Sequence, residues 1–182
     1  MVITVDASPW GYGGFIMAFG APIGYFAEPV SAEDVTKFGI VIGEAKFQAL
    51  LENLALLIAI RMWSTLWVKD RLAVCLRSDS MAAIGAWQKE RSKSPLINMV
   101  TRELSLDLAE GKFAVDRMEH LPGSLNTWAD ALSRLDQPGS GSTIPSALRK
   151  VTRYHPTVRD GSWWQLDLKP SDRVGCASVL EA

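Results

Sequence analysis

The chain opens with Val2-Ile-Thr-Val-Asp-Ala-Ser-Pro-Trp-Gly-Tyr-Gly-Gly-Phe-Ile-Met-Ala-Phe-Gly-Ala-Pro-Ile-Gly-Tyr-Phe-Ala27. β-Branched and aromatic residues favour strands, and glycine supplies the backbone freedom that tight turns need. Residues 2–7, 14–19 and 22–27 are therefore predicted strands, with glycine-containing turns between them. Three consecutive strands with short connections predict an antiparallel meander.

Helices and strands alternate beyond the meander. Residues 28–43 are predicted to form a loop. Residues 44–67 contain no Pro or Gly and many Leu and Ala, which predicts a long helix that must be covered on more than one side. We then predict strands over 72–76 and 112–118, helices over 80–89 and 95–110, and a last helix with Asn126 as its N-cap. This alternation predicts parallel pairing, and hence an α/β fold: a mixed five-stranded sheet with helices on both faces.

The amino-acid composition of the sequence changes after residue 135. Gln137-Pro-Gly-Ser-Gly-Ser-Thr-Ile-Pro145 is typical of a flexible linker. We therefore divide the chain into a domain over 1–135 and a linker with a C-terminal tail over 136–182, whose Trp163 and Trp164 are expected to pack on the domain. Met1 directly precedes the first core strand, which suggests a piece of a longer polyprotein.

Composition excludes some classes of protein. With 182 residues and a formal net charge of −1, the chain has no global attraction to nucleic acid, so such binding needs a local patch. Cys75 and Cys176 do not indicate a disulfide framework, and Cys75 is predicted to be a buried thiol. No apolar run reaches membrane-spanning length and no signal peptide is evident, so we expect an intracellular protein with no membrane partner.

Four acids stand in unusual settings: Asp6 at a strand end, Glu52 inside an apolar helix, Asp79 after a buried strand, and Asp130 in the last helix. A carboxylate beside apolar residues needs a partner. Mg²⁺ prefers oxygen ligands, and two ions ~3.5–4 Å apart can activate water and stabilise a leaving oxygen during phosphodiester cleavage. Convergence of these acids would therefore create a two-metal site, which Mn²⁺ can also occupy.

Each acid also has a simpler interpretation. Asp6 could stabilise a turn, Asp79 could cap the following helix, Asp130 could favour the helix dipole, and Glu52 could be a solvated helix residue. Glu44 is the other acid on the long helix. Eight residues place it ~12 Å from Glu52 along the axis, so both cannot serve one metal pair, and the apolar setting favours Glu52.

Residues 6–14, 52–63 and 77–80 are similar, in this order, to motifs of ribonuclease H domains in retroelement reverse transcriptases. The closest likeness lies in Glu119-His-Leu-Pro-Gly-Ser-Leu-Asn-Thr-Trp-Ala-Asp-Ala-Leu-Ser-Arg134. The resemblance implies the strand order 3-2-1-4-5 and a metal site of Asp6, Glu52, Asp79 and Asp130. It also implies cleavage of the RNA strand of RNA–DNA hybrids during reverse transcription, beside a reverse transcriptase domain.

The resemblance further implies that His120, on a mobile loop, assists proton transfer or product release; the alternative is a strand-end histidine bound to backbone. For substrate contacts, the candidates are Ser8 and an aromatic-basic patch of Trp87, Lys89, Arg91 and Lys93, although that patch could be a solvated helix end. Two rival functions remain: a catalytically silent nucleic-acid-binding module, or another nuclease or transposase of the same fold.

Overall fold

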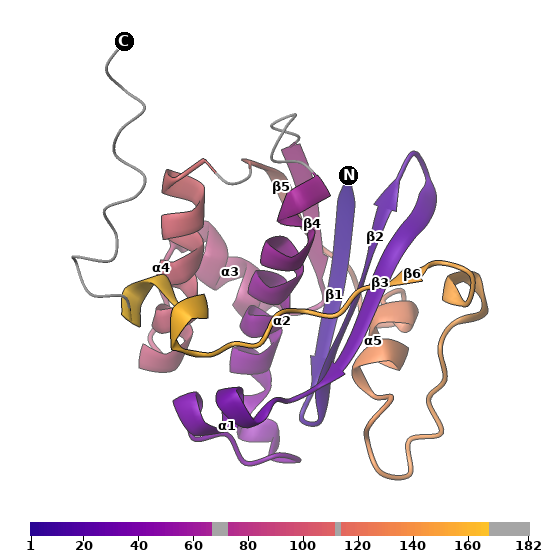
Figure 1. The fold of residues 1–182 in the computed structure, drawn as a ribbon, viewed down its shortest axis with the longest axis horizontal. Coiled ribbons are helices and arrows are strands. Elements are labelled where there is room, and N and C mark those ends of the chain that lie inside the picture. The colour runs from indigo at the N-terminus through magenta and orange to yellow at the C-terminus, as the bar shows by residue number, and fades with distance from the viewer. Residues whose placement is uncertain (67–72, 112–113, 168–182) are drawn as a thin grey trace.

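A computed structural model describes residues 1–66, 73–111 and 114–167. Its centre is one mixed sheet with the strand order β5-β4-β1-β2-β3-β6 (Figure 1). The first three strands, which form the antiparallel meander, are β1 (Val2–Ser8), β2 (Gly11–Ala18) and β3 (Ala21–Pro29). The strands that join parallel to their neighbours are β4 (Ala73–Ser78), β5 (Ala114–His120) and β6 (Thr152–Arg153).

The predicted α/β class, the meander and the order 3-2-1-4-5 are confirmed. The sheet has six strands, however, so the prediction of five was wrong. The additional strand β6 is two residues long and pairs with β3. Such a short strand has no hydrophobic alternation that a sequence pattern could indicate. The predicted starts at residues 72 and 112 lie outside the described residues.

Helices cover both faces of the sheet, as predicted. One face packs against α2 (Gln48–Trp63), with α3 (Met81–Lys89) and α4 (Pro95–Ala109) beyond it, and the other packs against α5 (Thr127–Ser133) (Figure 1). Side chains alternate across a strand, so neighbours serve different cores. Ile16 belongs to the larger core under α2, and Phe15 belongs to the smaller core under α5.

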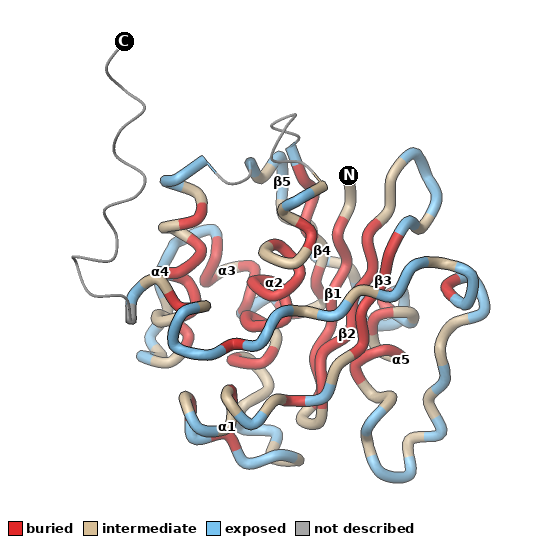
Figure 2. The backbone as a smooth tube through the Cα atoms, viewed as in Figure 1, coloured by how far each residue is buried: buried red, intermediate tan, exposed pale blue. Residues whose placement is uncertain are grey.

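Helix α2 is the central element of the larger core. A 3₁₀ turn precedes it (Ala45–Phe47) and another follows it (Ser64–Leu66). Together these segments are long and apolar enough to cross a membrane, but 61% of the most apolar window is buried inside the protein. Figure 2 shows α2 largely in the buried colour. Packing between the sheet and α4 thus accounts for its apolar surface.

The segment over 28–43 is not only a loop, so that prediction was wrong. It contains α1 (Ala32–Phe38), which begins after Ser31, whose hydroxyl accepts a hydrogen bond from the Asp34 amide at 3.2 Å. It ends at Gly39, whose φ of 64° is the left-handed conformation that glycine adopts easily. The helix has only two turns, too few to show an apolar period.

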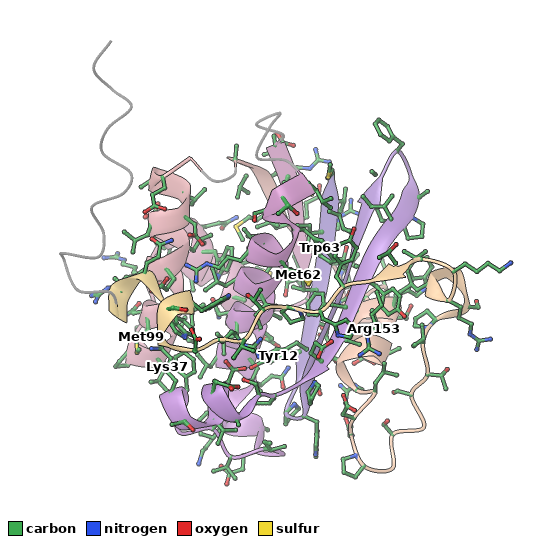
Figure 3. The ribbon with its side chains drawn as sticks, viewed as in Figure 1. Tyr12, Lys37, Met62, Trp63, Met99 and Arg153 are labelled. Atoms are coloured by element: carbon green, nitrogen blue, oxygen red, sulfur yellow. The ribbon has the colours of Figure 1, made fainter. Side chains whose placement is uncertain are left out.

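The C-terminal segment wraps around the β3 edge of the sheet. Leu148 is fully buried in the smaller core, and Trp164 is 2% exposed in the larger one, with its ring 5.4 Å from that of Phe38. Between them, the ring of Tyr154 contacts that of Trp63 edge to face. Figure 3 labels Trp63, the last residue of α2. The predicted packing of the tail is confirmed for Trp164, while Trp163 is half-buried.

A buried ion pair anchors this segment. The Arg159 guanidinium binds the Asp34 carboxylate at 2.5 Å, and both side chains are almost fully inaccessible. The Tyr12 hydroxyl donates a further hydrogen bond to Asp34 at 3.0 Å. Residues from β2, α1 and the tail therefore meet in one buried polar cluster.

Candidate functional site

Two of the candidate acids lie where neighbouring parallel strands end. Asp6 is near the end of β1, and Asp79 follows β4 directly. Because β1 and β4 pair in parallel, both carboxylates lie at the same edge of the sheet, the one formed by the carboxyl ends of these strands. Open α/β sheets bind their ligands at the carboxyl ends of the strands.

Asp6 is the most buried of the four acids, with 5% of its surface exposed. Burial raises its pKa to about 7; a hydrogen bond from Ser133 opposes this rise, and the charges of Asp79, Asp130 and Glu52 add to it. Two strands and two helices therefore bring the other three acids within electrostatic reach of Asp6.

Glu52 faces the same site from α2. Burial raises its pKa, the charge of Asp79 adds to this, and hydrogen bonds from Ser80 and Gln48 oppose it. The Gln48 amide donates to Glu52 Oε1 at 3.1 Å and to the Ala7 carbonyl at 2.5 Å, which ties the helix to β1. Glu44, by contrast, pairs with Lys46 and has a side chain that is 43% exposed.

Asp79 has a buried oxygen without a partner. Its Oδ1 accepts no hydrogen bond from the described residues. The simpler interpretation of Asp79 as a helix cap was wrong, because Ser80 caps α3 by accepting from the Ala83 amide at 3.1 Å. On its other side, a Cβ atom at Gly123 would lie 3.3 Å from Asp79 Oδ2, so the loop after β5 closes over this acid.

Asp130 is more accessible than Asp6, with 46% of its side chain exposed. Arg134, one turn later in sequence, donates to Asp130 Oδ1 at 2.6 Å. This hydrogen bond is the main cause that raises the pKa of Arg134, and the charges of Asp6 and Asp79 contribute. The guanidinium is therefore a built-in positive charge at the acidic cluster.

His120 is the last residue of β5 and is exposed, rather than part of the loop that follows. Its Nε2 lies 3.1 Å from the Asp79 carbonyl oxygen. The contact matches the alternative of a strand-end histidine bound to backbone. It also places the ring beside one of the four acids.

The donor chemistry of this cluster fits Mg²⁺ or Mn²⁺, which favour carboxylate oxygens. Asp79 has an unpartnered oxygen, and burial, with the charges of the other acids, raises the pKa of Asp6; a bound cation would balance both. Within residues 1–66, 73–111 and 114–167, however, no three of these acids are close enough to form a ready-made metal-binding group.

No family model and no curated protein matches the sequence. A solved structure does match: LC11-RNase H1, isolated from compost by a metagenomic approach. It is 18% identical in sequence, with a TM-score of 0.53, and the match covers 72% of this chain and 90% of that one. The chain has a ribonuclease H-like fold.

Within the ribonuclease H-like fold, Ser8 cannot serve as the predicted contact to a 2′-hydroxyl, because it is fully buried. Its hydroxyl donates to the Ser133 carbonyl at 2.7 Å and accepts from the amides of Trp10 and Gly11 at 3.2 Å. A turn followed by a predicted strand gave no indication that α5 would cover this position.

Asn126 is the N-cap residue of α5, as predicted, although its side chain makes no capping hydrogen bond. Its amide instead donates to the Val5 carbonyl at 3.1 Å. A residue that was expected to act locally thus holds the last helix of the ribonuclease H-like fold against β1, next to Asp6.

The predicted aromatic-basic patch is only partly present at the surface. Trp87 is 4% exposed and donates to Asn53 Oδ1 at 2.8 Å, so it belongs to the core and the prediction was wrong for this residue. Lys89, Arg91 and Lys93 are exposed and line a groove of about 600 Å³. Met81, the first residue of α3 and two residues after Asp79 in sequence, lines the same groove.

Sequence reasoning missed the residues that hold the acids in place. These residues are Gln48, Ser80, Ser133 and Arg134. Gln48 and Arg134 lie four residues from Glu52 and Asp130 on the same helices, and this spacing could have identified them. Nothing local could have linked Ser133 to Asp6, since 127 residues separate them.

Proposed function

We propose that this protein is a divalent-metal-dependent endoribonuclease that cuts the RNA strand of RNA–DNA hybrids. The main support is the gathering of Asp6, Glu52, Asp79 and Asp130 at one edge of a ribonuclease H-like sheet, with one buried Asp79 oxygen left without a partner. Acids that repel one another in a partly buried site are costly unless a cation balances them.

In this proposal, the four acids hold Mg²⁺, two ions when fully loaded, or Mn²⁺. The bound metal would supply an activated water and stabilise the leaving oxygen of the phosphodiester. The chain itself prepares the ligands: Gln48 and Ser80 orient Glu52, and Ser133 orients Asp6. His120, exposed beside Asp79, would transfer a proton during cleavage or help the product leave.

Substrate binding in this proposal relies on the basic groove. Lys89, Arg91 and Lys93 would contact backbone phosphates, which set the register of a hybrid without reading its sequence. We further propose that the protein acts inside the cell beside a reverse transcriptase domain of a retroelement. The motif over 119–134 is the support for that context.

A cleavage assay tests the proposal. The protein is incubated with end-labelled RNA–DNA hybrid, RNA duplex and DNA duplex, with Mg²⁺, with Mn²⁺ or with excess chelator. We expect cleavage of the RNA strand of the hybrid only, and only with metal. The Asp79→Asn variant, which removes one ligand oxygen, should lose nearly all activity and keep the wild-type circular dichroism spectrum.

The same assay separates the rivals. Hybrid binding without cleavage in any metal would favour a catalytically silent module. Cleavage of the DNA duplex would favour another nuclease or a transposase on this fold. Full activity in chelator, or in Asp79→Asn, would overturn the metal-dependent mechanism.

A further inference from the structure

The end of α5 packs directly on β1, which carries Asp6, and on the neighbouring strand β2. A Cβ atom at Gly13 would approach the Ala129 carbonyl oxygen and the Leu132 side chain to 2.6 Å, so only glycine in β2 allows the helix to come this close. Ser133, the last residue of α5, is consequently 1% exposed and sits beside β1.

Ser133 makes its shortest side-chain contact with Asp6. Its hydroxyl oxygen is 2.7 Å from Asp6 Oδ2 and 3.0 Å from the Asp130 carbonyl oxygen. The hydroxyl has one hydrogen, and a carboxylate is the stronger and here the closer acceptor, so the hydrogen is donated to Asp6. One Asp6 oxygen thereby has a fixed hydrogen-bond partner.

The backbone of Ser133 is itself held in place. Its carbonyl accepts the buried Ser8 hydroxyl at 2.7 Å, so β1 holds the helix end at two positions, Asp6 and Ser8. Ser8 and Ser133 thus connect β1 to the end of α5, and of these two serines only Ser133 contacts Asp6. The hydroxyl is buried, so no water competes for the carboxylate.

We propose that Ser133 is a positioning residue that orients Asp6 as a metal ligand. The inference rests on the proposed function, because it assigns a role toward the metal of that site. Partners that hydrogen-bond a ligating carboxylate fix its orientation, and their loss typically weakens metal binding ~10–100-fold. Ser133 would therefore couple the placement of α5, which carries Asp130, to the geometry of Asp6.

The test compares Ser133→Ala with Thr101→Val by calorimetric titration with Mn²⁺ alone and by thermal unfolding in chelator. Each variant removes one buried hydroxyl, so both should lower the unfolding temperature. We expect Ser133→Ala to weaken Mn²⁺ binding about tenfold or more. Thr101→Val should bind Mn²⁺ within about twofold of wild type, since the Thr101 hydroxyl donates to the backbone carbonyls of Ile97 and Asn98 in α4.

Wild-type Mn²⁺ affinity in Ser133→Ala, or an equal loss in both variants, would overturn the positioning role. If Ser133→Ala does not fold, Ser133→Cys replaces it, because cysteine is close in size and a weaker donor; an unchanged affinity in that variant overturns the role equally. Failure of the wild-type protein to bind Mn²⁺ would instead contradict the proposed function.

Discussion

At the scale of single residues, Asp6 is subject to opposed influences. Burial and three neighbouring acids favour its protonated form, and the Ser133 hydroxyl favours the carboxylate. The result is a pKa raised from 3.8 to about 7 in the metal-free protein. In the proposed metal site, a divalent ion would bind the carboxylate, so metal affinity and pH would be linked at this residue.

This raised pKa predicts how stability depends on pH. As pH rises from about 4 to 7, the unfolded chain releases the Asp6 proton first and the folded protein still retains it. The free energy of unfolding in chelator should therefore fall through this window and level off above it. Each unit of pKa difference corresponds to about 1.4 kcal/mol, although coupling among the acids reduces the total.

Urea unfolding between pH 4 and 8 measures the effect, with Asp6→Asn as the control that cannot titrate. The difference in stability between wild type and Asp6→Asn should change through the window and be constant above it. A difference independent of pH would contradict the raised pKa.

A second residue-scale prediction separates the two acids near α2. Glu52→Gln should lose most hybrid cleavage and weaken Mn²⁺ binding, because Glu52 interacts with Asp79. Glu44→Gln, an identical chemical change, should keep both within about twofold, because Glu44 pairs only with the exposed Lys46 at the surface. The reverse pattern would move the site toward the start of the helix.

At the scale of elements, the C-terminal segment is the part whose role the structure changes most. It adds β6, contributes Leu148 and Trp164 to two cores, and buries Arg159 against Asp34. All four candidate acids precede it in sequence. Its expected contribution is therefore to stability rather than to the chemistry.

The buried pair provides the test. Arg159→Ala leaves the Asp34 carboxylate buried without its cation and should cost about 3–5 kcal/mol of unfolding free energy. Arg153→Ala removes an arginine of the same segment whose pair with Glu28 is partly exposed, and should cost only about 1 kcal/mol. Chemical denaturation measures the free energy of unfolding of both variants. Equal losses would show that the buried Arg159–Asp34 pair stabilises the protein no more than the partly exposed Arg153–Glu28 pair does.

At the scale of the whole molecule, charge is distributed unevenly. The formal net charge is −1, yet three cations line one groove at the end of α3. In the proposed function, a hybrid would therefore be held by a local field rather than by the overall charge. Such binding weakens as salt rises, in proportion to the number of phosphates contacted.

Neutralising the groove should show this dependence. The triple variant Lys89→Gln, Arg91→Gln and Lys93→Gln should weaken binding to a hybrid and reduce the slope of log affinity against log salt by up to about 3. A control that changes Arg102, Arg149 and Lys150, all exposed, alters net charge equally and should keep the wild-type slope. Fluorescence anisotropy with a catalytically inactive background measures both, and equal slopes would contradict the groove.

The sequence by itself determined the features that depend on local patterns. Strand and helix periods predicted the meander, the long α2 and the alternation that makes the sheet mixed, because hydrophobic spacing has the same meaning in any fold. The four acids could be named because carboxylates stand out beside Val, Ile and Leu. Their order along the chain then indicated one family of folds.

Only the tertiary structure decided which polar groups meet. Ser8 and Trp87 looked available to a substrate and are buried, because α5 and α2 cover them. Asp6 depends on Ser133, 127 residues away, since the pairing of strands and the glycine at position 13 bring them together. Contacts between residues so distant in sequence leave no local pattern, so only the folded structure reveals them.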